Sequence, residues 1–158
     1  MLTICATGHR WEGLGIARTF RSDARLELVA RSFLLHLRPD AAISGFALGW
    51  DMAFARACVA LDIPLLAALP GGPGEQSARW KESDAMAHRL LLERCAMVEH
   101  IGEGYGFGRA CVMRDKWMVE HSHAVCAMWS GATSGTGKTV GFAERAGLPV
   151  INLWGLHQ

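Results

Sequence analysis

Apolar residues follow two alternating patterns along the chain. Short continuous apolar runs, which are typical of strands buried on both faces, alternate with longer segments in which apolar residues recur at helical spacing. In one such segment, Leu26, Val29 and Leu37 lie on one side of a predicted helix, which Pro39 ends. The chain is therefore predicted to alternate strands with helices.

The order of these segments predicts the fold class. Strands are expected over residues 2–6, 41–43, 65–69, 97–101, 124–129 and 149–153. Helices are expected between them, over residues 26–37, 52–59, 76–95 and 109–121 and from the turn at 131–137 to residue 146. This alternation predicts a Rossmann-like, doubly wound α/β domain with a mainly parallel sheet of about six strands and helices on both faces. The length of 158 residues fits a single domain over residues 1–158.

Composition narrows the expected partners and location. No apolar stretch is long enough to cross a bilayer, so no membrane partner is expected. The net charge of +1 provides no basic excess for a phosphate backbone, so a nucleic acid is not an expected partner. The five cysteines stand singly in apolar contexts, which is typical of core residues in a reducing compartment. The N-terminal residues lack signal-peptide features, and the expected location is cytoplasmic.

Two glycine-bearing turns follow the first two predicted strands. Thr7, Gly8, His9 and Arg10 follow the first strand, where ligands gather in such sheets. Their alternative role is structural, with Arg10 paired to a neighbouring carboxylate and His9 packed. The second turn begins at Ser44 and contains Gly45, Gly49 and Asp51. We expect the two turns to form a groove, although the second alone would also serve as a tight connection.

A third turn, residues 131–139, approaches a P-loop without matching it. Five residues separate Gly131 from Gly137, whereas the P-loop requires four, and Trp129 stands where the strand would need an acidic residue for Mg²⁺. NTP hydrolysis is therefore not expected. Backbone amides here would still hold a phosphate. The residues expected to do so are Gly131, Ser134, Gly135 and Thr136.

The predicted helix over residues 109–121 provides a cation and an aromatic ring as candidate ligand contacts. Arg114 and Trp117 share a helix face at i, i+3 and would contact the charge or the base of a nucleotide. The alternative is a Trp117 in the core and a solvated Arg114. The nearby His121 and His123 have no third ligand, so no metal is expected. We also expect no cofactor apart from a nucleotide-type ligand.

Together these motifs resemble the SLOG superfamily over nearly the whole chain. The resemblance rests on residues 7–10, residues 44–51, Arg114 with Trp117, and Gly135 with Thr136. The pattern is similar to small bacterial and phage members related to YpsA-like proteins; the superfamily also contains the lonely-guy enzymes and DNA-processing protein A. The resemblance implies a Rossmann-like domain that binds a nucleotide or nucleotide-derived ligand at these turns, often as a homodimer.

One departure bears on activity. The lonely-guy motif Pro-Gly-Gly-x-Gly-Thr-x-x-Glu carries a catalytic glutamate, whereas Gly135 and Thr136 are followed here by Gly137, Lys138 and Thr139. We therefore expect a binding module, a sensor or sequestering protein for an ADP-ribose-like ligand, rather than an enzyme. The alternatives are an N-glycosidic hydrolase in which Asp51 or Asp115 replaces that glutamate, and a single-stranded DNA binder like DNA-processing protein A.

Overall fold

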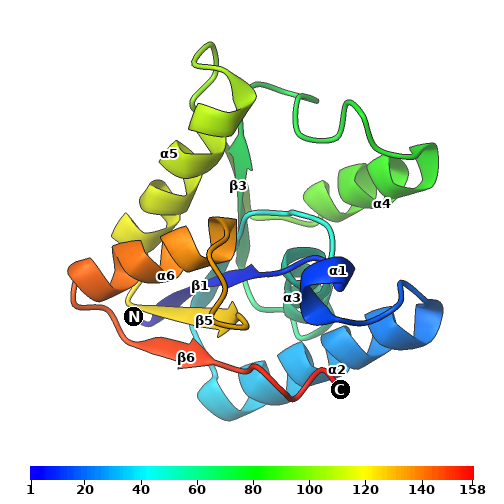
Figure 1. The fold of residues 1–158 in the computed structure, drawn as a ribbon, viewed down its shortest axis with the longest axis vertical. Helices are drawn as coiled ribbons and strands as arrows, with labels where there is room; N and C mark the ends of the chain where they lie inside the picture. Colours follow the sequence, from blue (N-terminus) through cyan, green and yellow to red (C-terminus); the bar gives the residue numbers. More distant parts are fainter.

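Six parallel strands form one sheet in the computed structural model, which describes residues 1–158 (Figure 1). The strands are β1 (Thr3–Gly8), β2 (Ala41–Ser44), β3 (Leu65–Pro70), β4 (Met97–Ile101), β5 (Ala124–Met128) and β6 (Val150–Asn152). Their order in the sheet is β4-β3-β2-β1-β5-β6. The predicted fold class, a Rossmann-like α/β sheet, is confirmed.

The strand order places a topological switch next to β1. The chain runs outward from β1 through β2 and β3 to β4, then returns to pair β5 with the other side of β1. In open parallel sheets, the loops on either side of such a switch leave a crevice beyond the carboxyl ends of the strands. The crevice here is bordered by the turns that follow β1, β2 and β5.

Helices cover both faces of the sheet (Figure 1). The helices are α1 (Trp11–Leu14), α2 (Phe20–Leu37), α3 (Trp50–Ala60), α4 (Glu82–Leu92), α5 (Phe107–Glu120) and α6 (Gly135–Arg145). The helices α2, α3 and α4 lie on one side, and α5 and α6 lie on the other. The larger core of 23 buried residues lies under α2 and α3, and a second core of 7 lies under α5 and α6.

Successive residues of a strand contribute alternately to the two cores. Ile4 and Ala6 of β1 belong to the larger core, whereas Cys5 between them belongs to the second. Because successive side chains of a strand point to opposite faces, a strand covered by helices on both faces must be apolar at every position. This explains the continuous apolar runs of the sequence.

The structure differs from the sequence prediction after β3. The predicted helix over residues 76–95 begins only at Glu82 and ends at Leu92. Gly71 and Gly74 have positive φ angles, and the Glu75 carboxylate accepts a hydrogen bond from the Gly72 amide, which holds the preceding segment as a series of turns. The short helix α1 was not predicted; it ends at Gly15, whose φ is 69°.

The cysteines are free thiols. Cys5, Cys58 and Cys126 are buried, as expected for core residues, whereas Cys95 and Cys111 are partly exposed. Burial raises the pKa of the Cys5 thiol to about 12, which keeps it protonated and unreactive at neutral pH. None of the helices combines the length and the apolar character needed to traverse a bilayer.

Candidate functional site

The turns after β1 and β5 are joined by His9. The Ser130 backbone amide donates to His9 Nε2 over 3.2 Å, and the Ser130 hydroxyl lies 3.1 Å from the same nitrogen. The His9 amide in turn donates to the Met128 carbonyl. Because Nε2 accepts a backbone N–H, the imidazole is neutral, in agreement with burial, which lowers the pKa of His9. His9 therefore positions the turn after β5 through its Nε2 atom.

The turn after β2 is held against the same residues. The Trp50 amide donates to the His9 carbonyl over 3.3 Å. Gly49 has a φ of 95°, and a Cβ there would lie 2.8 Å from both the Arg10 Cα and the His9 oxygen. Only glycine permits this approach. The structure thus brings three turns together, residues 8–10, 45–49 and 129–134, which we call the strand-end cleft.

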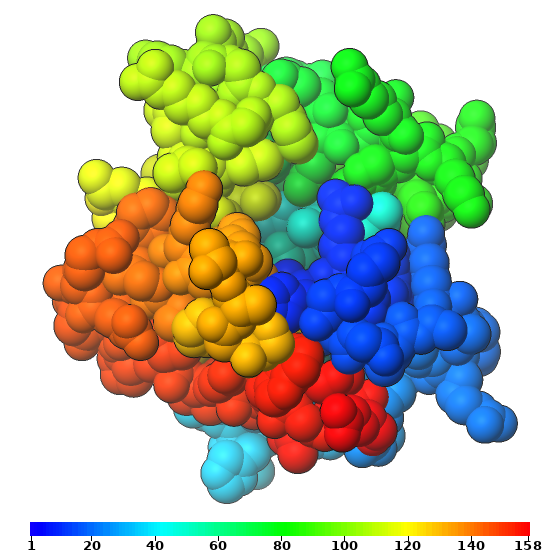
Figure 2. All heavy atoms as spheres, viewed as in Figure 1, coloured from blue at the N-terminus to red at the C-terminus, as the bar shows by residue number.

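The surface is hollowed at this cleft. In Figure 2 a depression lies where the blue β1 turn, the orange start of α6 and the yellow-green α5 meet, with cyan residues of the β2 turn at its floor. The green residues that follow β3 form its remaining border. A cavity of about 250 Å³ lies at the start of α6, where Trp129, Ser134 and Lys138 are among the lining residues.

The start of α6 borders this cavity through Ser134, Gly137 and Lys138. The Ser134 side chain caps the helix by accepting the Gly137 amide over 3.1 Å. Gly131 has a φ of 90°, and no atom lies within 4 Å of a Cβ placed at Gly135. Thr136 is buried beneath these residues. The helix dipole and the nearby Lys138 ammonium favour an anion in this position.

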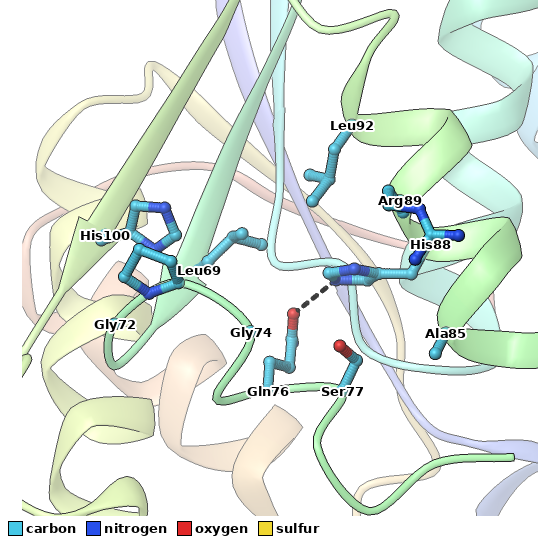
Figure 3. A pocket seen from close by; sticks show the side chains of 11 residues that line it. Leu69, Gly72, Gly74, Gln76, Ser77, Ala85, His88, Arg89, Leu92 and His100 are labelled. Atoms are coloured by element: carbon cyan, nitrogen blue, oxygen red, sulfur yellow. Dashed lines mark hydrogen bonds between the residues drawn. The ribbon is translucent and has the colours of Figure 1, made fainter. Parts of the chain in front are cut away.

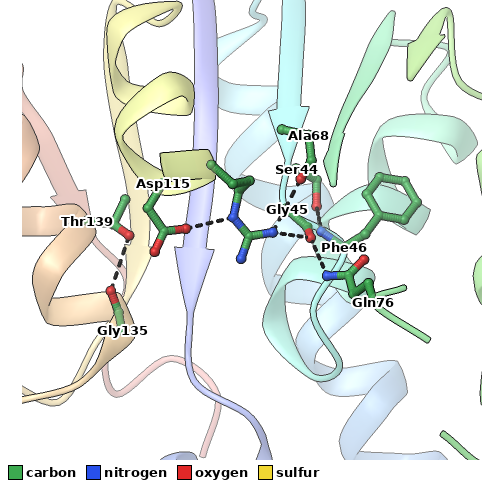
Figure 4. A network of polar contacts seen from close by, with 9 residues as sticks. Ser44, Gly45, Phe46, Ala68, Gln76, Asp115, Gly135 and Thr139 are labelled. Atoms are coloured by element: carbon green, nitrogen blue, oxygen red, sulfur yellow. Dashed lines mark hydrogen bonds and ion pairs between the residues drawn. The ribbon is translucent and has the colours of Figure 1, made fainter. Parts of the chain in front are cut away.

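Arg114 joins the turn after β2 to β3 through the carbonyls of Gly45 and Ala68, two residues labelled in the polar network of Figure 4. Its Nη1 donates to the Gly45 carbonyl over 2.6 Å and to the Ala68 carbonyl over 3.2 Å, and its Nε donates to Asp115 over 2.7 Å. The side chain is only 8% exposed. Arg114 is therefore not solvated: its Nη1 and Nε atoms hold Gly45 after β2, Ala68 within β3 and Asp115, whereas its Nη2 makes no hydrogen bond with the protein.

Asp51 is the second buried charged residue at the cleft. It lies in the first turn of α3, is 6% exposed, and its Oδ1 has no hydrogen-bond partner. Burial raises the pKa of Asp51 to about 7; the Arg114 charge opposes this rise and the Asp115 charge adds to it. The group is therefore partly protonated near neutral pH.

Arg10 is the free cation of the cleft. Its side chain is exposed and makes no hydrogen bond or ion pair with the protein, so it is not paired with a neighbouring carboxylate. It lies close enough to Asp51 for its charge to lower the pKa of that carboxyl. Asp115 is a second carboxyl whose pKa is raised by burial. The charge of Arg114 opposes this rise. Arg10 is thus available for an incoming anion.

The remaining predicted residues divide between support of the cleft and the core. Thr7 is buried at the end of β1. The Ser44 hydroxyl is fully buried, donates to the Asp51 carbonyl and accepts the Phe46 amide, so it shapes the β2 turn. Trp117 stacks on His121 with 3.9 Å between ring centroids and packs against the second core. The structure does not bring Trp117 to the three turns.

Sequence reasoning missed Gln76 and His88. The Gln76 side-chain amide donates to the Gly45 carbonyl over 2.8 Å, so this oxygen is shared with Arg114 (Figure 4). The Gln76 side-chain oxygen lies 2.9 Å from His88 Nε2. No motif marks either residue, since one stands in an irregular segment and the other on a helix. Only the fold brings them to the cleft.

The buried carboxyl of Asp51 leads to a testable pH dependence. Because its pKa is raised in the folded state, its contribution to stability is full below about pH 4 and is lost as the pH rises towards 7. Asp51→Asn removes this loss. The free energy of unfolding of the wild type should fall by about 2–3 kcal/mol relative to the variant between pH 5 and pH 8, as measured by urea denaturation.

The matched control is Glu93→Gln, which neutralises an exposed carboxylate on the same chain. The free energy of unfolding of Glu93→Gln should change with pH in the same way as that of the wild type. Identical pH profiles for Asp51→Asn and the wild type would contradict the assignment of a buried, protonated Asp51.

Solved structures resemble this fold, whereas sequence comparisons find no match. No protein-family model and no curated protein sequence matches the chain. The structure of TM1055 superposes with a TM-score of 0.66 at 13% identity, covering 99% of this chain and 76% of that one. Molybdenum cofactor carrier protein from Chlamydomonas reinhardtii superposes with a TM-score of 0.58 at 17% identity, covering 94% and 74%.

Two structures of DNA processing protein A also superpose. The Streptococcus pneumoniae protein gives a TM-score of 0.66 at 16% identity, and the Helicobacter pylori protein, described for its single-stranded DNA binding mode, gives 0.64 at 16%. Each match covers 94% of this chain, but only 49% and 63% of the respective neighbour. At such identities the likeness establishes the Rossmann-like fold alone.

Proposed function

We propose that this chain is a SLOG-type domain that binds a nucleotide or nucleotide-derived ligand, similar to ADP-ribose, in the strand-end cleft. The observation that carries the proposal is the convergence of three glycine-bearing turns, held together by the hydrogen bonds of His9 with Ser130 and Trp50. The sequence resemblance to SLOG proteins and the carrier function named for the Chlamydomonas neighbour add support for a sensor or sequestering module.

The chemistry of the cleft suits a phosphorylated ligand. Backbone amides at the start of α6, next to Lys138, would hold a phosphate, and the unpaired guanidinium of Arg10 would contact it from the facing turn. Burial raises the pKa of Asp51 to about 7, and Asp115 is paired with Arg114, so the two carboxyls would repel the anion less than two unpaired charges would. No covalent step is required for binding.

The most informative experiment is mass spectrometry of the small molecules released when the purified protein is denatured, combined with calorimetric titration of ADP-ribose and AMP. The proposal predicts a nucleotide-type molecule in the released fraction or a saturable heat with ADP-ribose. If the protein releases no such molecule and neither nucleotide gives heat at millimolar concentration, the proposed function is wrong.

Arg10→Ala should weaken this binding without changing the fold. Arg10 is exposed and makes no contact that holds the turn, so its loss removes only a charge-assisted bond to the ligand. We expect affinity for ADP-ribose to fall by about 1–3 kcal/mol in calorimetry, with the melting temperature of the free protein unchanged. Arg94→Ala removes another exposed arginine, at the far end of α4, and should have no effect. Equal affinities of all three proteins would remove Arg10 from the site.

A nucleotide N-glycosidic hydrolase is the second candidate. Such an enzyme needs a protonated or basic carboxyl near the ribose, and Asp51 has a pKa raised to about 7, within the range useful for a general acid. Its unpartnered Oδ1 is enclosed by protein, however, which favours binding over cleavage. Incubation with AMP and ADP-ribose, followed by chromatography for free base or ribose phosphate, separates the two functions.

Single-stranded DNA binding is a third candidate, since the Helicobacter pylori neighbour is described by that property. The net charge of +1 disfavours it, because such sites rely on a basic groove with stacked aromatic rings. A gel-shift assay at low salt would show retardation of an oligonucleotide if this function is correct, and no retardation if the nucleotide cleft is the functional site.

We also propose that the chain forms a homodimer. Leu28 and Leu35 of α2, together with Leu156, are more than half exposed, and an apolar groove of about 400 Å³ lies between α2 and the C-terminal residues. Sedimentation equilibrium should give twice the chain mass of 17.2 kDa, and a Leu28→Glu variant should return the monomer.

A further inference from the structure

A second cavity lies beside the strand-end cleft, beneath α4 (Figure 3). Its volume is about 300 Å³, the lower end of the range for small-molecule sites. In Figure 3, His88 reaches into it from α4, Leu69 and Leu92 border it on apolar sides, and Gln76 closes it below. Gln76 also donates to the Gly45 carbonyl, so one side chain borders both the cavity and the cleft.

The hydrogen bonds of Gln76 fix the tautomer of His88. Since the Gln76 amide nitrogen donates to a carbonyl, its side-chain oxygen must be the atom that faces His88 Nε2, 2.9 Å away. Nε2 therefore carries the proton and donates it to this oxygen. Burial lowers the pKa of His88 to about 4, so the ring is neutral at pH 7 and Nδ1 is a bare acceptor.

Nδ1 of His88 has no partner within the protein, although the residue is only 5% exposed. The ring cannot turn away, because Trp80 and Phe46 pack against it edge-on, with centroids 5.1 and 5.7 Å distant. An unpartnered acceptor on a rigidly held ring that lines a cavity favours a ligand that carries an N–H or O–H donor.

The other polar groups of the cavity complement that acceptor. Arg89 makes no ion pair and contacts only the Met86 sulfur, over 3.0 Å, so its N–H donors are available. Ser77 supplies a hydroxyl. With Leu69 and Leu92 as the apolar walls, the lining combines the fixed acceptor of His88 with the donors of Arg89 and Ser77 and with the His100 imidazole.

We propose that this cavity binds the base of the nucleotide ligand, and that it selects a base with an exocyclic amine, as in adenine. The amine of adenine would donate to His88 Nδ1, and an adjacent ring nitrogen would accept from Arg89 or Ser77; adenine presents this pair of a donor beside an acceptor. The assignment of the ligand rests on the proposed function, whereas the donor requirement rests on the geometry of His88.

The distance between the base cavity and the phosphate-binding turn after β5 determines how long a ligand must be to occupy both. The cavity adjoins β3 and β4, and the phosphate-binding turn follows β5, three strands away from β3 in the sheet. Three inter-strand spacings of about 4.8 Å amount to about 14 Å. A nucleoside monophosphate carries its phosphate one ribose from the base, so a ligand that occupies both sites is pyrophosphate-linked, as ADP-ribose is.

The test follows the imidazole nitrogens of His88 by ¹⁵N NMR while adenine is added to the wild type. Purine, which lacks the exocyclic amine, is the control ligand.

Two variants test whether the ligand enters the cavity. Ala85→Trp fills the cavity from α4 without removing a polar group, and Ala87→Trp places the same ring on an exposed position of that helix. In parallel, calorimetry compares ADP-ribose with ribose 5-phosphate. His88→Phe, which keeps the ring shape and loses the acceptor, serves if Ala85→Trp fails to fold.

We expect adenine, and not purine, to shift the Nδ1 resonance of His88 saturably in the wild type and in Ala87→Trp, but not in Ala85→Trp. Ala85→Trp and His88→Phe should weaken ADP-ribose about tenfold or more and leave ribose 5-phosphate unchanged. An unmoved Nδ1 resonance with adenine overturns the proposal, as does undiminished ADP-ribose affinity in both variants. If no nucleotide binds but adenine still shifts His88, the proposed function fails and the base site stands.

Discussion

Gly8→Ala should strongly lower the free energy of unfolding and weaken ligand binding. A Cβ at this position would lie 2.4 Å from Cδ1 and 2.7 Å from Cβ of Trp50, a side chain with no exposed surface. The Trp50 Cβ is fixed by the backbone of α3, so rotation of the indole cannot relieve the clash. We expect a loss of about 3 kcal/mol in the free energy of unfolding.

The same variant should report on the site, because Gly8 ends β1 and Trp50 begins α3. Moving the two apart breaks the hydrogen bond of the Trp50 amide with the His9 carbonyl and opens the cleft. Gly108→Ala is the control: no atom lies within 4 Å of its Cβ position, and alanine is favoured in the helix, so stability should be unchanged or slightly higher. Similar urea midpoints for the two alanine variants would refute the close packing at Gly8.

Arg114→Met should cost about 3 kcal/mol and abolish binding of ADP-ribose. The substitution removes the donors to the Gly45 and Ala68 carbonyls and leaves Asp115 buried without its cation. Breaking a buried, hydrogen-bonded charge pair by deleting one partner is among the more destabilising changes in proteins. Urea denaturation measures the stability, and calorimetry measures the binding.

Lys116→Met supplies the comparison on the same helix. Lys116 is 64% exposed and faces Glu120 over 3.8 Å, so the same change of charge should alter stability by less than about 0.5 kcal/mol. Adding Asp115→Asn to Arg114→Met should recover part of the loss, because residue 115 is then no longer a buried carboxylate deprived of its cation. Equal stability of the two methionine variants would mean that Arg114 does not hold the strand ends.

The fold was predictable because the apolar runs, the helix-period segments and the short connections between them all indicate the same fold class. Apolar runs such as residues 2–6 must be covered on both faces, and helix-period segments such as 26–37 supply the cover. Short connections between them enforce parallel strands and place the glycine-bearing turns at one edge of the sheet. The proximity of the turns after β1, β2 and β5 follows from that topology.

The roles of single polar residues were not predictable in the same way. Periodicity shows that Arg114 and Trp117 share a helix face, but not how far a long side chain reaches. In the structure Arg114 extends to two strand ends, whereas Trp117 remains against His121. Charged side chains on helices are usually solvated, so only the tertiary structure identifies an exception.

The later start of α4 has a similar explanation. Residues 76–81 have the composition of a helix, but the helix begins only at Glu82. The Gln76 side chain instead donates to the Gly45 carbonyl, and the Glu75 carboxylate accepts from the Gly72 amide. The Gln76 bond joins residues 31 positions apart, and a tertiary contact of this kind overrides local propensity. These hydrogen bonds also create the cavity around His88, which no spacing in the sequence indicates.

Backbone amide chemical shifts of the ¹⁵N-labelled protein, recorded while ADP-ribose is added, test the central claim most directly. The account predicts saturable shifts in residues 8–10, 45–49 and 129–137, and in the residues around His88 that hold the base, with the amides of α2 unaffected. Unchanged spectra at saturating ADP-ribose, or shifts confined to the opposite edge of the sheet, would contradict it.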